Sequence, residues 1–169
     1  MEVLEALITR RSIRKYTHQK VEKEIIMELV KAGMFAPSAC NKQPWHFIIV
    51  DNRETLNAIA AFHPNAKMLT DTTSAIVICG DEVKAHGKGY WPVDCSAATQ
   101  NILLAAHAKG LGACWLGIYP REERIAAMKE LFALPEHIHA FSVVSIGYPA
   151  ETPKMANRFD ESRIHFNLW

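Results

Sequence analysis

The chain has 169 residues, a length that corresponds to one domain with one hydrophobic core. Hydrophobic residues make up 49% of it and charged residues 22%, which excludes a disordered chain, a collagen-like repeat and a small disulfide scaffold. Its 19 Lys and Arg residues nearly balance 18 Asp and Glu residues, so the net charge is +1. Because binding to a nucleic-acid backbone needs a basic excess, we expect no nucleic-acid partner.

The amino-terminal residues do not resemble a secretory leader. Acidic Glu2 and Glu5 stand where a signal peptide carries positive charge, and no apolar run approaches the roughly 18 residues of a membrane span. We therefore expect a cytoplasmic protein without a membrane segment. The four cysteines are widely separated, and we expect them to be reduced and buried: Cys40, Cys79, Cys95 and Cys114.

Residues 2–9 are predicted to form a short helix with its apolar residues on one side. The segment 10–16 follows and contains four cations and a hydroxyl. In an extended chain Arg10, Ser12 and Arg14 share one side, and in a helix the two arginines share one face. Guanidinium groups beside a hydroxyl suit a phosphate dianion, because each donates two parallel charge-assisted hydrogen bonds. A solvated basic face is the alternative, and the sequence leaves both open.

A stronger helix is predicted over residues 21–34, where apolar residues recur at helical spacing and Pro37 prevents continuation. The loop 37–45 then holds two amides, Asn41 and Gln43, between prolines. Each amide offers a donor and an acceptor, the combination that recognises the edge of a heterocycle such as a pyrimidine. Capping of the loop's own backbone is the alternative role for these side chains.

Four short apolar segments bounded by turn residues are typical of strands buried on both faces: residues 47–50, 75–79, 113–118 and 141–146. A helix over residues 94–109 is predicted to begin at Asp94 as its N-cap and to end at Gly110. Apolar residues nearly encircle it, which indicates burial in the core or at a subunit interface. A further amphipathic helix is predicted over residues 121–131, and a polar, proline-containing tail follows residue 148.

Glycines surround the predicted strand within residues 110–117, but no helix begins at its end, so it is not a dinucleotide-binding phosphate loop. A glycine inside a strand indicates either close approach of a flat group to the backbone or a bulge. Among eight histidines only His137 and His139 are closely spaced, and no further ligand stands near them, so we expect no metal. No G-x-S-x-G motif supports hydrolase chemistry.

Four motifs, taken together and in order, resemble the nitroreductase family of flavin-dependent oxidoreductases over about residues 2–169. They are Arg-Arg-Ser-Ile-Arg-Lys-Tyr at 10–16, Ala-Pro-Ser-Ala-Cys-Asn-Lys-Gln-Pro-Trp at 36–45, Gly-Leu-Gly-x-x-Trp-Leu-Gly at 110–117 and Asn-Arg-Phe-Asp at 157–160. The resemblance implies an α+β fold, with a mixed, mainly antiparallel sheet flanked by helices, in an intertwined homodimer. Alternation of strands and helices alone would suggest a parallel sheet. One domain would span 1–169, with 149–169 extending onto the partner subunit.

The resemblance also implies FMN as cofactor. Its phosphate, ribityl chain or pyrimidine edge would contact residues of the first motif and the tail: Arg10, Arg11, Ser12, Arg14 and Arg158. The second motif would cover the flavin of the partner subunit through Pro37, Ser38, Ala39, Asn41 and Gln43. Trp115, Leu116 and Gly117 would lie along the isoalloxazine ring with backbone N–H groups toward N5 and O4, and Lys67 would lie near the flavin.

The implied activity is hydride transfer from NADH or NADPH to N5 of FMN, followed by reduction of an electron-poor small molecule such as a nitroaromatic or a quinone. The flavin carries the chemistry, so no catalytic residue is predicted. A flavin protein for storage or sensing is the alternative, and a metal-binding or structural dimer is a third. Residues 81–92 stand where larger relatives carry a helical excursion, and they form either a mobile aromatic element or a plain surface connection.

Overall fold

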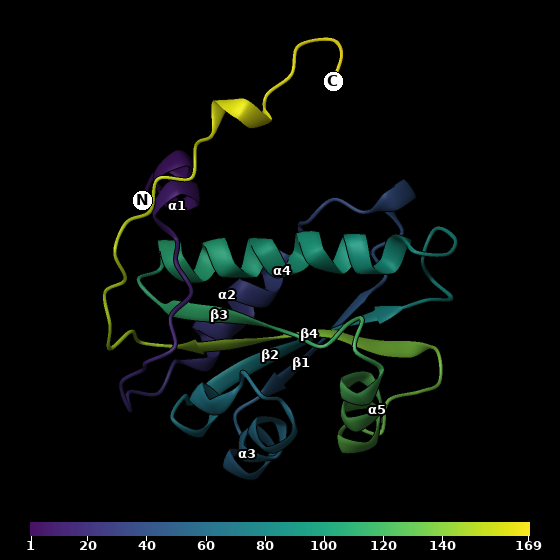
Figure 1. The fold of residues 1–169 in the computed structure, drawn as a ribbon. Coiled ribbons are helices and arrows are strands. Elements are labelled where there is room, and N and C mark those ends of the chain that lie inside the picture. Colours follow the sequence, from purple (N-terminus) through teal and green to yellow (C-terminus); the bar gives the residue numbers. More distant parts are fainter.

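The computed structural model describes residues 1–169 and arranges them in layers around one sheet (Figure 1). The sheet has four strands in the order β1-β2-β4-β3, and every neighbouring pair is antiparallel. The strands are β1 (Trp45–Val50), β2 (Ser74–Asp81), β3 (Gly112–Gly117) and β4 (Ile138–Gly147). One isolated parallel bridge joins Ser12 to Ala113 on β3. The α+β class with a mainly antiparallel sheet is therefore confirmed.

Helices cover both faces of this sheet. On one face lie α2 (Lys23–Met34) and α4 (Tyr90–Ala108), and on the other lie α3 (Arg53–Phe62) and α5 (Glu122–Leu131) (Figure 1). The short α1 (Val3–Thr9) lies over the carboxyl end of α4, and 3-10 turns occur at Ala39–Asn41, Lys67–Thr70 and Glu161–Arg163. None of the helices combines the length and the apolar composition that a bilayer crossing requires.

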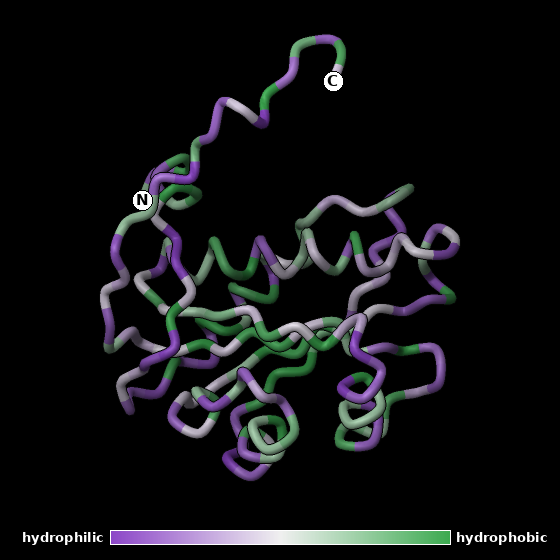
Figure 2. Tube along the Cα trace, viewed as in Figure 1, coloured by the Kyte–Doolittle hydropathy of each residue, from purple (hydrophilic) through white to green (hydrophobic).

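Side chains alternate across the sheet, so each strand contributes to two cores. On β2, Ile76 and Ile78 pack with α2 and α4, whereas Val77 and Cys79 pack with α3 and α5, and all four are buried. Figure 2 shows the resulting apolar strands at the centre of the molecule. Burial on both faces explains why the central strand β2 lacks the alternation of polar and apolar residues found in a half-exposed sheet, whereas the edge strand β1 is partly exposed.

The start of α4 differs from the prediction. The helix begins at Tyr90 rather than after Asp94, and its N-cap is Gly89, whose φ of 85° is left-handed. Pro92 lies in the first turn, where the missing proline N–H has no intrahelical partner to lose. Asp94 is instead buried one turn into the helix, and its Oδ1 accepts a hydrogen bond of 2.9 Å from the Ala39 N–H.

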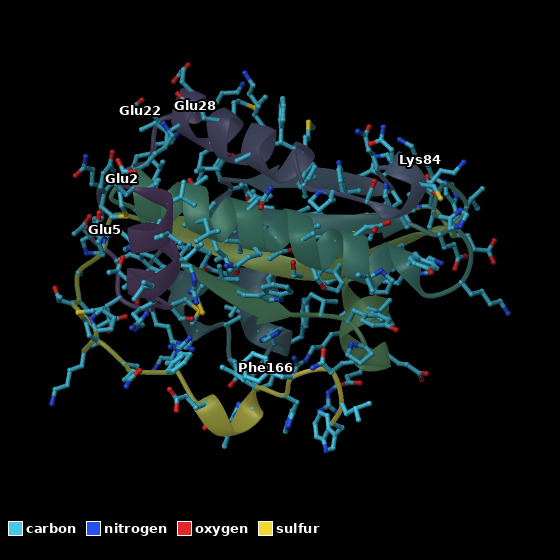
Figure 3. The ribbon with its side chains drawn as sticks, turned by 90° about the horizontal axis from the view of Figure 1, so that it is seen from above. Glu2, Glu5, Glu22, Glu28, Lys84 and Phe166 are labelled. Atoms are coloured by element: carbon cyan, nitrogen blue, oxygen red, sulfur yellow. The ribbon has the colours of Figure 1, made fainter.

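Large apolar side chains remain exposed on α1 and along the carboxyl-terminal tail. Only Ala6 of α1 is buried, while Val3 and Leu4 keep more than two thirds of their surface exposed. The carboxyl-terminal tail extends away from the layers (Figure 1), and its Phe166, labelled in Figure 3, is exposed. Surface of this kind in a folded chain marks a site of association.

The cysteines follow the expectation in three of four positions. Cys79, Cys95 and Cys114 are buried, and no disulfide links any of the four. Cys40 is exposed, because it lies in the loop after α2 rather than in a strand or helix of the core. Burial raises the pKa of Cys79 to about 12, so this thiol is protonated and packs as a small apolar group.

Candidate functional site

The arginine segment 10–16 lies extended against the sheet because two glycines leave room for it. A Cβ at Gly112 would stand 2.6 Å from Ile13 Cγ2, and a Cβ at Gly147 would stand 2.8 Å from Tyr16 Cδ1. Ile13 also donates its N–H to the Ala113 carbonyl at 3.0 Å. The close approach predicted for a glycine in the third motif is thus made at Gly112 by a side chain of the chain itself.

Tyr16 and Glu151 fix the other side of this segment. The Tyr16 hydroxyl donates to the Ile13 carbonyl at 2.6 Å and lies 2.7 Å from Ser145 Oγ. Glu151, at the start of the tail, accepts from the backbone N–H groups of Arg14 and Lys15 at 2.5 and 3.1 Å. The segment is therefore held by hydrogen bonds between β3 and the tail.

Three predicted side chains of this segment gather on one side, as the extended alternative requires. Burial raises the pKa of the Cys114 thiol on β3, while Arg14, Ser12 and Arg10 each act on the same thiol to lower it. Arg10, Ser12 and Arg14 therefore all lie near the Cys114 side chain in the first half of β3. Arg11 faces elsewhere, in keeping with the alternation of an extended chain.

Arg10 lies in a cluster of positive charge. Burial lowers its pKa from the usual arginine value, and the neighbouring Arg158 and Arg11 lower it further. Its guanidinium makes no ion pair and no hydrogen bond with any acceptor of the chain. Arg10 is half-buried, whereas Arg14 and Arg158 are exposed, and the Glu151 carboxylate nearby is engaged by the backbone N–H groups of Arg14 and Lys15. A half-buried cation without an acceptor suits an anionic ligand, because a bound anion would supply the missing acceptor and the missing charge.

Arg11 has a structural role in the arrangement. Its guanidinium donates to the carbonyls of Ile8 at 2.7 Å, of Arg10 at 2.8 Å and of Ala156 at 3.3 Å. The last bond ties the tail to the end of α1, two residues before Arg158. Arg11 thus brings the backbone beside Arg158 toward Arg10, and its own contact with FMN stays a prediction.

The outer edge of β3 offers backbone donors. Ile118 donates its N–H to Phe141 on the β4 side, and Ala113 receives Ile13 from the outer side. Because the direction of backbone groups alternates along a strand, the N–H groups of Trp115 and Gly117 face outward. Gly117 also has open space, since nothing lies within 4 Å of a Cβ built there.

Leu116 is turned away from this edge. By the same alternation its N–H faces β4, and its side chain is buried in the core beneath the sheet. The expectation that the Leu116 amide faces a flavin therefore needs correction, because the register of β3 with β4 engages this amide in the sheet. Trp115 and Gly117 are the residues of the third motif whose amides are available.

The Gly117 carbonyl receives two donors from the opposite layer. His63, directly after α3, places Nε2 at 3.0 Å from this oxygen, and Arg124 of α5 donates to it at 2.8 Å. Burial lowers the pKa of His63, an effect that Arg124 reinforces and the Gly117 bond opposes. Lys67 is exposed and lines an open depression of about 520 Å³ together with His63, and its contact with a flavin stays a prediction.

The loop 37–43 is built from its own hydrogen bonds. Ser38 Oγ accepts from the Gln43 N–H at 2.9 Å, and Gln43 Nε2 donates to Asn41 Oδ1 at 3.1 Å. Cys40, Asn41 and Gln43 all have left-handed φ values between 48° and 53°. Backbone strain of this kind costs about 1–3 kcal/mol per residue and concentrates at functional sites. The two amides bond to each other, while the backbone of the loop is capped by Ser38, and the contact of Asn41 and Gln43 with a ligand stays a prediction.

The arginine cluster and this loop lie at opposite ends of α4 (Figure 1). Asp94 near the start of the helix binds the loop, and His107 near its end lies 2.8 Å from Thr9, next to Arg10. A separation of 13 residues along an α-helix corresponds to about 20 Å. Within one chain the loop therefore does not reach the arginine cluster.

Comparison with known proteins decides the family. The family model described as "Nitroreductase family" matches residues 7–71 and 63–148. The chain belongs to this family. A protein of Methanothermobacter thermautotrophicus, provisionally named an NADH dehydrogenase/NAD(P)H nitroreductase, is 50% identical over 169 residues, which is 100% of this chain and 88% of the relative.

Solved structures of the family share the fold over nearly the whole chain. One from Parabacteroides distasonis, with the same provisional name, is 44% identical and has a TM-score of 0.95, covering 99% of this chain and 98% of that chain. A provisionally named nitroreductase from Desulfovibrio desulfuricans, solved in complex with FMN, is 29% identical with a TM-score of 0.87, covering 100% and 98%.

Several residues of this nitroreductase-family site escaped prediction from the sequence. His63 and Arg124 reach Gly117 only through the packing of α3 and α5, and Asp94 was assigned to a cap instead of to the loop it binds. No sequence pattern marks any of these contacts. No group of three or more His, Cys, Asp or Glu side chains is arranged to hold a metal ion.

The connection 81–92 is tied down at both ends. Asp81 accepts from the N–H groups of Val83 and Lys84, and Trp91 stacks on His139 with ring centroids 5.5 Å apart. Between these ends Gly87 and Gly89 adopt left-handed φ values. These contacts describe an ordered surface connection, and its role toward a substrate stays a prediction.

Proposed function

We propose that this protein is an FMN-dependent oxidoreductase that passes electrons from NADH or NADPH to an electron-poor acceptor such as a nitroaromatic or a quinone. The observation that carries the proposal is the half-buried Arg10 beside Arg158 and Arg14 near the start of β3, with no carboxylate to pair it, and the open backbone edge at Gly117 at the other end of the same strand. FMN has the matching chemistry, a phosphate dianion at one end and a flat ring with polar edge atoms at the other. The names of the relatives support the same cofactor and electron donors.

The chain's residues would divide the cofactor between them. Arg10, Ser12, Arg14 and Arg158 would bind the phosphate end, and the outward N–H groups of Trp115 and Gly117 would face the polar edge of the ring. Lys67 would lie at the periphery, near the end of β3. When bound, FMN would accept a hydride from the nicotinamide and deliver the electrons to the acceptor. The protein's part is to bind, orient and stabilise negative charge, so no side chain is assigned as an acid or base.

We also propose that the working form is a homodimer. The loop 37–43 and the arginine cluster are about 20 Å apart along α4, so one chain does not enclose a cofactor with both. A two-fold axis that sets two α4 helices side by side in opposite directions would bring the loop of one subunit to the arginines of the other. The exposed apolar residues of α1 and of the tail 149–169 would then be covered by the partner.

Spectra of the purified protein test the activity. We expect bound FMN to give flavin absorbance bands, and anaerobic addition of NADH or NADPH to bleach them. Bands that persist after both nucleotides would favour the storage or sensing alternative. A folded protein that takes up no FMN at micromolar concentration would refute the proposal.

Subunit mixing tests the shared site. One variant carries Arg10→Ala, and a second carries Asn41→Ala with Gln43→Ala, so each alone binds FMN poorly at both sites. After the two are unfolded together and refolded, mixed dimers would contain one site built from unaltered parts, and FMN binding would return at one site per mixed dimer. If mixing restores nothing although mixed dimers form, each site belongs to one chain and the dimer proposal fails.

A further inference from the structure

Gly117 is the point at which three elements meet. It ends β3, and its carbonyl receives His63 Nε2 at 3.0 Å and the Arg124 guanidinium at 2.8 Å. Glycine has the freest backbone of all residues, so its orientation at a strand end depends on such contacts. The N–H and the carbonyl of one strand residue face the same side, so the two donors that hold the carbonyl also fix the direction of the Gly117 N–H.

The hydrogen bonds assign the protonation of His63. Asn65 donates its N–H to Nδ1 at 3.2 Å, so Nδ1 is the acceptor and carries no proton in the neutral ring. Nε2 then carries the proton and donates it to the Gly117 carbonyl. Arg124 lies 3.2 Å from Nε2, and because that nitrogen has its proton, the Arg124 donor serves the carbonyl oxygen.

Arg124 brings a positive charge to this carbonyl. Its side chain is half-buried, and none of the ion pairs of the structure includes it. A cation without a carboxylate partner retains its field, and partial burial reduces the screening of that field by water. The charge therefore acts on whatever lies against the outer edge of β3 at Gly117.

We propose that Arg124 and His63 are positioning residues that fix the Gly117 peptide and, through it, raise the reduction potential of the bound flavin. The inference rests on the proposed function, because it takes the flavin to lie along the outer edge of β3. A reduced flavin carries more negative charge than an oxidised one, so a fixed N–H and a nearby cation favour the reduced form. Neither residue needs to touch the cofactor, since both act on the carbonyl of the residue that does.

The midpoint potential of FMN bound to the whole protein is the decisive measurement. We expect Arg124→Gln to lower the ratio of affinities for reduced over oxidised FMN about tenfold, which is a fall of about 30 mV for a two-electron couple. Arg121→Gln is the matched control, because Arg121 precedes the same helix, is exposed and has the same charge. We expect the control to leave the potential unchanged, since water and salt screen an exposed charge.

His63 provides an independent pair of variants. His63→Gln keeps an amide N–H that reaches toward the carbonyl, whereas His63→Leu keeps the bulk and removes the donor. We expect the potential to fall in His63→Leu and to be largely restored in His63→Gln. In the FMN-free protein, ¹⁵N NMR should find the proton on Nε2 of His63 near neutral pH.

The outcomes separate this inference from the proposed function. Wild-type protein that binds no FMN refutes the proposed function and this inference with it. Wild-type protein that binds and reduces FMN, with Arg124→Gln unshifted or shifted no more than Arg121→Gln, refutes only the inference. If Arg124→Gln does not fold, Arg124→Lys keeps the charge without the planar donor, and its potential must lie nearer that of wild type than that of His63→Leu.

Discussion

The Arg10→Ala variant should lose affinity for FMN without losing stability, because the Arg10 side chain makes no hydrogen bond or ion pair that stabilises the fold. Its guanidinium has no hydrogen-bond acceptor and no ion pair within the chain, and Arg158 and Arg11 repel it. Arg10→Ala removes a donor to the phosphate, and a charge-assisted hydrogen bond contributes about 1.5–3 kcal/mol. FMN affinity should therefore fall about 10- to 150-fold. Riboflavin lacks the phosphate, so its affinity should change far less.

The same variant should leave the FMN-free protein as stable as wild type or slightly more stable, because it relieves repulsion among three arginines. Arg53→Ala is the matched control. Arg53 donates to the backbone carbonyls of Leu69 at 2.7 Å and Thr70 at 2.8 Å, and to that of Thr72. Leaving such carbonyls unpaired costs about 1–3 kcal/mol, so this variant should lose free energy of unfolding while any FMN-loaded fraction keeps normal affinity.

Calorimetric titration with FMN and with riboflavin measures the first effect, and urea unfolding of the FMN-free protein measures the second. Parallel losses of affinity for both ligands would place Arg10 away from the phosphate. An Arg10→Ala protein as unstable as Arg53→Ala would show that Arg10 supports the fold, which contradicts the reasoning.

Three further predictions concern single positions. Gly80→Ala places a Cβ 2.2 Å from Trp91 Cε3, so the ring must move, and urea unfolding should show a loss of about 1–3 kcal/mol; unchanged stability and unchanged near-ultraviolet dichroism would contradict that packing. Burial lowers the pKa of His63 below the 6.5 of an unfolded chain, so its contribution to stability is complete above pH 6.5 and is lost as the pH falls below it. His63→Gln should therefore flatten the profile of unfolding free energy on the acid side, and an unchanged acid slope would disprove this origin. Asp94→Ala removes the acceptor that holds the loop 37–43, so hydrogen exchange in that loop should rise, whereas Asp94→Asn, which keeps Oδ1, should stay close to wild type; equal protection in both variants would show that another contact holds the loop.

The sequence predicts most elements of this fold because their signals are local. The helical spacing over 21–34 reappears as α2, and each apolar segment between turn residues becomes a strand of the sheet. The direction in which neighbouring strands pair, in contrast, has no local signal in the sequence. Burial on both faces produces the same apolar composition in parallel and antiparallel strands, so residues on β2 such as Val77 cannot indicate which neighbour pairs with them.

The features that escaped prediction either have a sequence signal that fits a second interpretation or depend on residues far apart in the chain. Asn52 caps α3 by accepting the Thr55 N–H, and Leu56 and Ile59 are buried on this helix, yet no helix was predicted over its residue range. Asp94 has the chemistry of an N-cap, and only its burial against Ala39 reveals its actual partner. The composition of the segment 10–16 was enough to identify it as a candidate phosphate-binding segment. His63 and Arg124, in contrast, meet Gly117 from elements far apart in the chain.

The contacts along the outer side of β3 have a consequence for how this protein avoids aggregation. An edge strand with unpaired backbone groups invites a strand from another molecule to pair with it. Here Ile13 occupies the Ala113 carbonyl, and His63 with Arg124 occupies the Gly117 carbonyl, so only Trp115 between them presents both of its backbone groups. One residue is too short to template a new β ladder, and the sheet therefore ends at β3 instead of growing from one molecule into the next.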